Sequence, residues 1–221
     1  MFKTEKQLVN TITKSVVSSG LRNFVKPSLP INVFKELNLG YGIADIVFVQ
    51  YYKEINGRGK FFDYFDLSIL KIIENEKKTT LEEIHNSTKT TTHKIRQSIK
   101  KLEEEGFIKI IDKKYLPKKK YNIIVKNSIA IEAKLRDWRR GLKQAYRYNW
   151  FSSKSFVFLP QDNIDLAIND IALFQKLNVG LASINKEGEI TIAYNPKHSE
   201  PHSERMSRLL NEKVLNALLK K

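Results

Sequence analysis

The residues best suited to chemistry are an acid and a lysine at the end of an apolar run, Ile129-Ala130-Ile131-Glu132-Ala133-Lys134. Side chains two apart in a strand point to the same side, so Glu132 and Lys134 should lie together while Ala133 faces the core. Asp45 ends the segment Gly42-Ile43-Ala44-Asp45 inside a second apolar run, and an aspartate within a strand usually has a charged partner or a metal ion. Two carboxylates for a divalent metal, with an ammonium beside them, are typical of phosphodiester cleavage.

The pattern of acid, any residue and lysine is common in so charged a chain. It also occurs at Glu76-Lys77-Lys78, in a polar stretch, and at Asp112-Lys113-Lys114, in a predicted turn. Neither follows an apolar strand, whereas Glu132 and Lys134 follow one and precede a predicted helix start at Asp137. The alternative is a charged strand end whose two side chains pair in solution.

The segment after Lys134 predicts an amphipathic helix over 137–149. Trp138, Leu142 and Ala145 recur at helical spacing and should pack inward. The other faces carry cations that could hold phosphate, at Arg136, Arg139, Arg140, Lys143 and Arg147. Gln144 lies on the same helix.

Three segments together resemble the PD-(D/E)XK nuclease superfamily, which includes many restriction endonucleases and Holliday-junction resolvases. They are Ala44-Asp45, with alanine where the family name has proline, Glu132-Ala133-Lys134, and Gln144-Ala145-Tyr146-Arg147-Tyr148. The resemblance implies an α/β fold with a mixed sheet flanked by helices. The predicted order of elements is similar: a helix over 4–18, strands near 31–36 and 42–49, the strand of Glu132, the helix over 137–149 and a strand at 155–159. A helix over 167–177, strands at 179–184 and 189–194 and a tail helix over 203–221 would complete the domain.

The resemblance further implies a Mg²⁺-dependent endodeoxyribonuclease, with Mn²⁺ as a substitute ion. Asp45 and Glu132 would hold the metal, together with the backbone carbonyl of Ala133. Lys134 would stabilise charge on the phosphate or orient the attacking water, and Gln144 would assist from its helix. Glu5 and Glu36 are further candidates for an acidic metal ligand. The alternative is that both are surface charges.

The long segment between Asp45 and Glu132 predicts a domain of its own. Helical patterns begin at Phe61, at Leu81 after a Thr79-Thr80 cap, and at Thr90, where the helix runs to Gly106. A strand over 107–111 then turns back through Asp112-Lys113-Lys114. Three helices and a basic hairpin make a winged helix-turn-helix, and residues 102–108 are similar to the junction between recognition helix and wing in that family. The expected domains are 1–60 with 121–221, and an insert over 61–120.

The insert carries side chains suited to DNA. Those that open its third helix could reach phosphates and base edges in the major groove, and three lysines follow the wing. The expected DNA contacts are Lys89, Thr91, Thr92, His93, Lys94, Arg96, Lys118, Lys119 and Lys120 in the insert, with Arg139, Arg140 and Lys143 outside it. The alternatives are a solvated charged surface and a winged helix that holds a protein partner.

Composition agrees with DNA as the partner. The chain of 221 residues has a net charge of +15, which favours a polyanion. No apolar run approaches the ~20 residues of a membrane span, and the N-terminus lacks a signal-peptide core. The chain has no cysteine and its four histidines do not cluster. We therefore expect a soluble cytoplasmic protein, and a homodimer if both DNA strands are to be cut.

Two other functions fit the same features. One is a DNA-binding protein with a nuclease-like fold but no catalysis, and the other is a winged-helix transcription regulator whose α/β portion binds an effector or a protein. Both predict DNA binding that survives loss of Asp45, Glu132 or Lys134.

Overall fold

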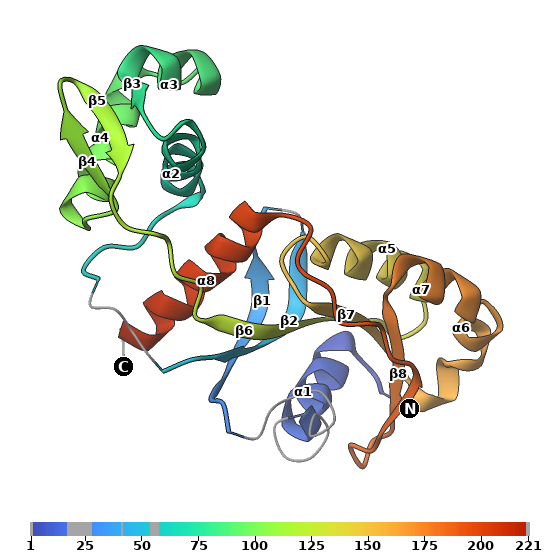
Figure 1. Cartoon of the computed structure of the whole chain (residues 1–221). Helices are drawn as coiled ribbons and strands as arrows, with labels where there is room; N and C mark the ends of the chain where they lie inside the picture. Colours follow the sequence, from blue (N-terminus) through green and yellow to red (C-terminus); the bar gives the residue numbers. More distant parts are fainter. Residues whose placement is uncertain (1, 17–27, 41, 54–57, 220–221) are drawn as a thin grey trace. The chain divides into compact units, whose positions relative to one another are not determined.

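The computed structural model describes residues 2–16, 28–40, 42–53 and 58–219, in two compact units (Figure 1). The first unit comprises Met1–Lys53 with Val125–Glu204, and the second comprises Glu54–Ile124 with Arg205–Lys221. The first contains α1 (Glu5–Ser15), β1 (Ile31–Asn38), β2 (Ile43–Tyr51), β6 (Val125–Ala133), α5 (Trp138–Tyr148), β7 (Lys154–Pro160), η2 (Gln161–Asn163), α6 (Asp165–Asn169), α7 (Ile171–Leu177), β8 (Gly180–Ile184) and β9 (Ile190–Tyr194). The second contains α2 (Tyr64–Glu76), β3 (Thr79–Thr80), α3 (Leu81–Thr88), α4 (Thr92–Glu104), β4 (Ile108–Ile111), β5 (Lys114–Pro117) and α8 (Glu204–Leu219).

The first unit is built on a six-stranded mixed sheet in the order β1-β2-β6-β7-β8-β9. Strands β6, β7 and β8 are parallel, and the other neighbours are antiparallel. Parallel neighbours need crossover connections, which here contain α5 and then α6 with α7. The predicted α/β class, with a mixed sheet flanked by helices, is confirmed.

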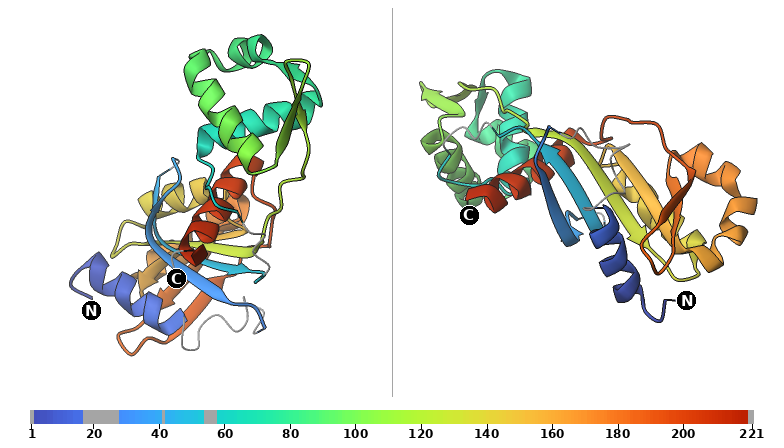
Figure 2. Two further views of the ribbon diagram at one scale, coloured as in Figure 1. Left: turned by 90° about the vertical axis from the view of Figure 1, so that its left-hand side faces the viewer. Right: turned by 90° about the horizontal axis from the view of Figure 1, so that it is seen from below.

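The two faces of this sheet pack against different helices. Ile129 and Ile131 of β6 join a buried cluster with Leu8 and Ile12 of α1. Residues of the opposite parity, including Ala130 and Glu132, face the side where α5 lies (Figure 1). Figure 2 shows the twist of the sheet from two further sides. The alternation along β6 thus directs Glu132 away from the α1 core.

Strands β2 and β6 are neighbours although the first segment of the second unit separates them in sequence. Their antiparallel register pairs Ile46 with Ile131 and continues, past a bulge, to Tyr51 and Val125. The second unit thus follows β2 and precedes β6 at the point where an ordinary hairpin would have its turn. This neighbourhood is what the sequence predicted for the strands of Asp45 and Glu132.

The second unit consists of α2, α3 and α4 around a small sheet in the order β3-β5-β4 (Figures 1 and 2). Capping boxes begin α2, at Asp63, and α3, at Thr80. Gly106 has a φ of +72° just after α4, as the sequence predicted for a left-handed cap. Asp112 and Lys113 have φ of 50° and 61°, which makes the tight turn between β4 and β5.

The tail helix α8 differs from its expected assignment. The sequence predicted this helix as part of the α/β domain, in its segment 121–221, whereas its residues from Arg205 belong to the second unit. Glu212 accepts hydrogen bonds from the Arg58 guanidinium at 2.7 and 2.8 Å, from the Tyr121 hydroxyl at 2.6 Å and from the Phe62 N–H at 2.9 Å. A buried carboxylate with this many donors holds the helix in place. The unit also begins and ends outside the expected 61–120.

The predicted helix over 167–177 is wrong in one respect, because it is two helices. Asp170 has φ −106° and ψ 25°, and its N–H turns back to the carbonyls of Ala167 and Ile168. Ile168, an apolar residue of the first of these helices, is 42% exposed. At the other end of the chain, α1 is described through its cap at Val16, and the rest of the helix predicted over 4–18 lies outside the described residues.

The described part of the chain contains no helix that is both long and apolar enough to cross a bilayer.

Candidate active site

Asp45 and Glu132 approach each other from two adjacent strands. The β2–β6 register pairs Ile46 with Ile131, so the next residues outward, Asp45 and Glu132, lie across from each other. The Asp45 carboxylate also accepts a hydrogen bond from the Ala133 N–H, with Oδ2 2.7 Å from the nitrogen. Strand pairing alone therefore brings together the two acids that were predicted to share a metal.

Lys134 completes the predicted trio. Its Nζ lies 2.6 Å from Oε1 of Glu132 and 3.9 Å from Oε2 of Glu5 on α1. The backbone N–H of Lys134 donates to the Phe158 carbonyl at 3.0 Å, which extends the β6–β7 pairing and fixes where the side chain begins. The side chain is 12% exposed, so the ammonium is held among acids at the surface end of the strand.

Gly141 allows α5 to lie close to Lys134. A Cβ atom at this position would come within 3.1 Å of Cγ of Lys134 and of Cγ1 of Val157. That separation is tighter than ordinary van der Waals contact, so any larger residue would push the helix or the lysine aside. The absence of a side chain at Gly141 is thus part of the geometry of the site.

Tyr148 is a site residue for which the sequence predicted no role, although it ends the segment 144–148 that carries the family resemblance. Its hydroxyl contacts Oε2 of Glu132 in a short hydrogen bond and lies 2.8 Å from the carbonyl oxygen of Ile43. Tyr148 is buried on the inner face of α5, four residues after Gln144. That spacing, which puts both side chains on one side of the helix, was the signal that could have identified it.

The electrostatics of the site favour added positive charge. Burial raises the pKa of Glu132, and the nearby charge of Asp45 raises it further, although the hydrogen bonds from Lys134 and Tyr148 oppose this. Burial also raises the pKa of Asp45, against the opposing effect of the Ala133 N–H. The pKa of Tyr148 is raised by burial and by the charge of Glu132, so its phenol stays protonated and remains a donor.

The two further acidic candidates lie near enough to influence the pair. Glu5 and Glu36 both raise the pKa of Asp45 through their charges. Glu36 has a φ of 50°, in the left-handed region that is unfavourable for a glutamate inside a strand. Even so, no group of three or more histidine, cysteine, aspartate or glutamate side chains is arranged to hold a metal ion, as far as the described ranges extend.

Gln144 lies on α5, one turn before Tyr148, and is partly buried. Its Oε1 atom is buried and has no hydrogen-bond partner among the described residues. An unsatisfied buried carbonyl is unfavourable unless a ligand or water supplies a donor. Gln144 is therefore the predicted site residue whose hydrogen bonding the described chain leaves incomplete.

The predicted cations of the first unit are exposed on α5. Arg139 pairs with Asp170 at 2.8 Å and stacks 4.2 Å from the Trp138 ring centroid, so it has a structural role. Arg140 and Lys143 are exposed. Arg147, near the end of the same helix, is exposed as well, so these three cations could meet a polyanion.

The predicted DNA contacts of the second unit are exposed at the start of α4 and after β5. Lys89, Thr91, Thr92, His93, Lys94, Arg96, Lys118, Lys119 and Lys120 are all in the exposed class. Lys94 lies over the Phe65 ring at 4.6 Å, and His93 shares a 2.9 Å hydrogen bond with Gln97. Thr91 precedes α4 without a side-chain cap hydrogen bond, in contrast to the caps of α2 and α3.

Comparisons with protein-family models, with curated proteins and with solved structures find no match to this chain.

Proposed function

We propose that the protein is a metal-dependent DNA endonuclease of the PD-(D/E)XK type, with a winged helix-turn-helix as its second unit. One observation supports this above all: Asp45 and Glu132 converge from neighbouring strands with the Lys134 ammonium 2.6 Å from Glu132. Burial raises the pKa of both acids, and the charge of Asp45 raises that of Glu132 further, which is the condition that a bound cation would relieve.

The residues at the site fit a Mg²⁺ ion. Mg²⁺ usually takes one or two carboxylates and completes its shell with water and substrate phosphate, so a third acidic side chain is not required. Asp45 and Glu132 would hold it, with the Ala133 carbonyl as a further oxygen donor. When bound, such an ion polarises the scissile phosphate and lowers the pKa of a coordinated water.

The chain's own residues then have distinct tasks. Lys134 would place its positive charge against the phosphate oxygens as negative charge develops on them, and its fixed position avoids a reorganisation penalty. Tyr148 donates to Glu132 and so orients that carboxylate. Gln144 would use its unsatisfied Oε1 to accept a hydrogen bond from water or from a nucleotide amine.

DNA binding is assigned to the second unit. The N-terminus of α4 carries exposed Thr92, His93 and Arg96, and its first N–H groups have no side-chain cap. Uncapped N–H groups and a helix dipole favour phosphate, and polar side chains at that end can reach base edges. The hairpin β4–β5, with Lys109 and Lys113 exposed, would serve as the wing.

The experiment is a cleavage assay on duplex, nicked, branched and single-stranded DNA with Mg²⁺ or Mn²⁺. Lys134→Ala should lower the cleavage rate by ~100-fold or more while DNA binding persists, because the ammonium acts mainly on the transition state. The matched control is Lys126→Ala, an exposed lysine on the same strand β6, which should cleave like the parent. Purified protein that leaves every DNA intact with both ions would contradict the proposal.

The second candidate is a DNA-binding protein without cleavage. It is favoured by the finding that both oxygens of Glu132 already have partners, Lys134 and Tyr148. In that case the charged cluster would be a structural ion pair, and replacement of Lys134 would leave DNA binding unchanged with no cleavage in either protein.

A further inference from the structure

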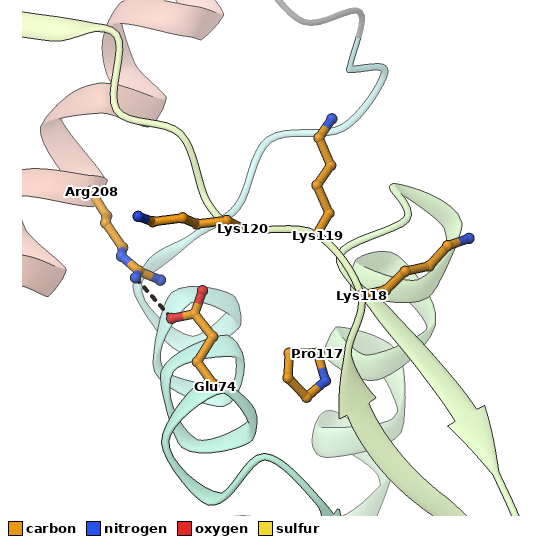
Figure 3. Close-up of a pocket in the computed structure, with 6 residues that line it drawn as sticks. All are labelled: Glu74, Pro117, Lys118, Lys119, Lys120 and Arg208. Atoms are coloured by element: carbon orange, nitrogen blue, oxygen red, sulfur yellow. Dashed lines mark ion pairs between the residues drawn. The ribbon is translucent and has the colours of Figure 1, made fainter.

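The second unit contains a basic pocket away from α4 and from the hairpin turn. Its volume is about 350 Å³, and it is lined by Glu74 of α2, Pro117 of β5, Lys118, Lys119 and Lys120 after that strand, and Arg208 of α8 (Figure 3). Four cationic side chains and one carboxylate give these residues a formal charge of +3.

Arg208 is the fixed cation of this pocket. Its side chain is 7% exposed, and its guanidinium lies 2.8 Å from the Glu74 carboxylate and 4.8 Å from the Tyr121 ring centroid. The Tyr121 hydroxyl also donates to the Arg208 carbonyl at 3.2 Å. An arginine held on two sides adds its positive charge to the wall of the pocket at a fixed position.

Two of the three lysines are anchored at their backbones, and all three side chains are exposed. The N–H groups of Lys118 and Lys119 donate to the Phe107 carbonyl at 2.8 and 3.3 Å. Figure 3 shows the Lys120 side chain extending toward Arg208, while those of Lys118 and Lys119 point outward. Lys120 and Arg208 thus form a pair of cations with one carboxylate beside them, and two more lysines stand at the rim.

We propose that this pocket binds a terminal phosphate group, which is dianionic and is attached through only one oxygen. A chain phosphodiester carries a single charge and has a sugar on both sides, so it suits an open surface better than a recess. A terminal phosphate can enter end-on, and ~350 Å³ is at the lower end of ordinary ligand pockets. Its source would be the 5′ end of a nucleic acid strand or a free nucleotide. The inference is independent of the nuclease proposal, because every residue involved lies in the second unit.

Substitution of Glu74 should change the affinity for an anion in the opposite direction to substitution of a lysine. Its carboxylate competes with a bound anion for Arg208 and adds a repulsive charge. Glu74→Gln keeps the size of the side chain and a hydrogen-bond acceptor while removing that charge. Lys120→Gln removes a cation from the same pocket, so the two variants should shift anion affinity in opposite directions.

The experiment is a titration of the full chain, at fixed ionic strength, with three probes. They are inorganic pyrophosphate, a 5′-phosphorylated oligonucleotide and the same oligonucleotide with a 5′-hydroxyl. Lys120→Gln should weaken pyrophosphate binding about fivefold and Glu74→Gln should tighten it by a similar factor, as expected for one charge at a partly exposed site. The control is Lys78→Gln, an exposed lysine of the same unit outside the pocket, which should bind like the parent.

The outcomes distinguish a 5′ strand end from a free nucleotide as the ligand, and distinguish both from non-specific binding of anions. Preference for the 5′-phosphorylated over the 5′-hydroxyl oligonucleotide identifies a strand end, whereas pyrophosphate binding without that preference identifies a nucleotide. Equal weakening by Lys120→Gln and Lys78→Gln, or no tightening by Glu74→Gln, would overturn the proposal. Thermal unfolding of each variant distinguishes lost binding from lost structure.

Discussion

Glu132 is held by a lysine on one oxygen and a tyrosine on the other, and this determines its orientation. The hydrogen bonds from Lys134 and Tyr148 favour the charged carboxylate, whereas burial and the charge of Asp45 oppose it, and the pKa of Glu132 is raised on balance. Burial also raises the pKa of Asp45, so the charged forms of both acids are disfavoured in the folded protein and the site is locally unstable. Such local instability is common where binding, and not folding, has determined the residues.

This instability predicts the effect of Asp45→Asn on folding. Because burial raises the pKa of Asp45 above its ordinary 3.8, its charged form is disfavoured in the folded protein, and stability is lost as pH rises through the folded-state pKa. Asparagine keeps an oxygen for the Ala133 N–H without the charge. If the gain is ~1 kcal/mol, the variant should melt about 2–4 °C above the parent at pH 7 without metal.

The pH dependence checks the cause of that effect. The difference in melting temperature should shrink as pH falls toward 3.8, where Asp45 of the unfolded chain is itself half protonated. The control is Glu200→Gln, at an exposed acid of the same unit. It should change neither the melting temperature at pH 7 nor its dependence on pH. An Asp45→Asn variant less stable than the parent at pH 7 would show that the carboxylate stabilises the fold.

Side-chain contacts that follow from strand periodicity could be predicted from the sequence. Contacts between elements that are distant in the sequence could not. The pairing of Glu132 with Lys134 followed from a period of two, and the 2.6 Å contact bears it out. Tyr148 acts through a contact between α5 and the sheet, whose distance no local pattern determines. Arg58, which the expected domain bounds placed outside the insert, has a 7% exposed side chain paired with Glu212, because α8 returns from the far end of the sequence.

At the scale of elements, the β2–β6 pair is the feature on which the site depends. The sequence indicated both strands and the acids that they carry, Asp45 and Glu132. The strand register places these two acids opposite each other, as expected. The helix over 167–177 was predicted as one, because apolar spacing continues through Asp170, where the backbone breaks. The membership of α8 was also missed, because an amphipathic stripe shows that a helix packs but does not identify its partner.

The pairing of Tyr51 with Val125 predicts that the first unit can fold without the second. Replacing 54–124 with a short turn of about four residues and ending the chain at 204 should leave a cooperative thermal transition. A companion variant that keeps 205–221 would leave the buried charges of Arg208 and Glu212 without Glu74 and Arg58. It should therefore be less soluble than the shorter chain. Loss of cooperative unfolding in the shorter chain would contradict the division into two units.

At the scale of the whole molecule, charge is the property that bears most on function. The net charge of +15 attracts polyanions to any exposed face, so binding alone does not identify a DNA-reading surface. The informative comparison is between cations of the same unit at different places. Those at the start of α4 lie beside an uncapped helix N-terminus, whereas Lys77 and Lys78 lie at the end of α2.

Charge reversal at the start of α4 should therefore weaken DNA binding more than reversal elsewhere. Lys94→Glu with Arg96→Glu should lower affinity about 10-fold or more at moderate salt and reduce the slope of log affinity against log salt by about 2, if each contacts one phosphate. Lys77→Glu with Lys78→Glu makes the same change in net charge and serves as the control. If both double variants bind equally well, α4 is not the DNA-reading helix, and a protein partner becomes the better assignment for this unit.

The proposed function requires Asp45 and Glu132 to hold a divalent ion with which Lys134 acts in cleaving DNA. Its most direct test is the cleavage rate measured against Mg²⁺ concentration for the parent and for Asp45→Asn. The parent should show no cleavage without the ion and a saturable rise with it, whereas the variant should need at least ~10-fold more Mg²⁺ or remain inactive, because it lacks a ligand charge. Cleavage that is independent of Mg²⁺, or that has the same Mg²⁺ dependence in both proteins, would rule out Asp45 as a ligand of a catalytic metal ion.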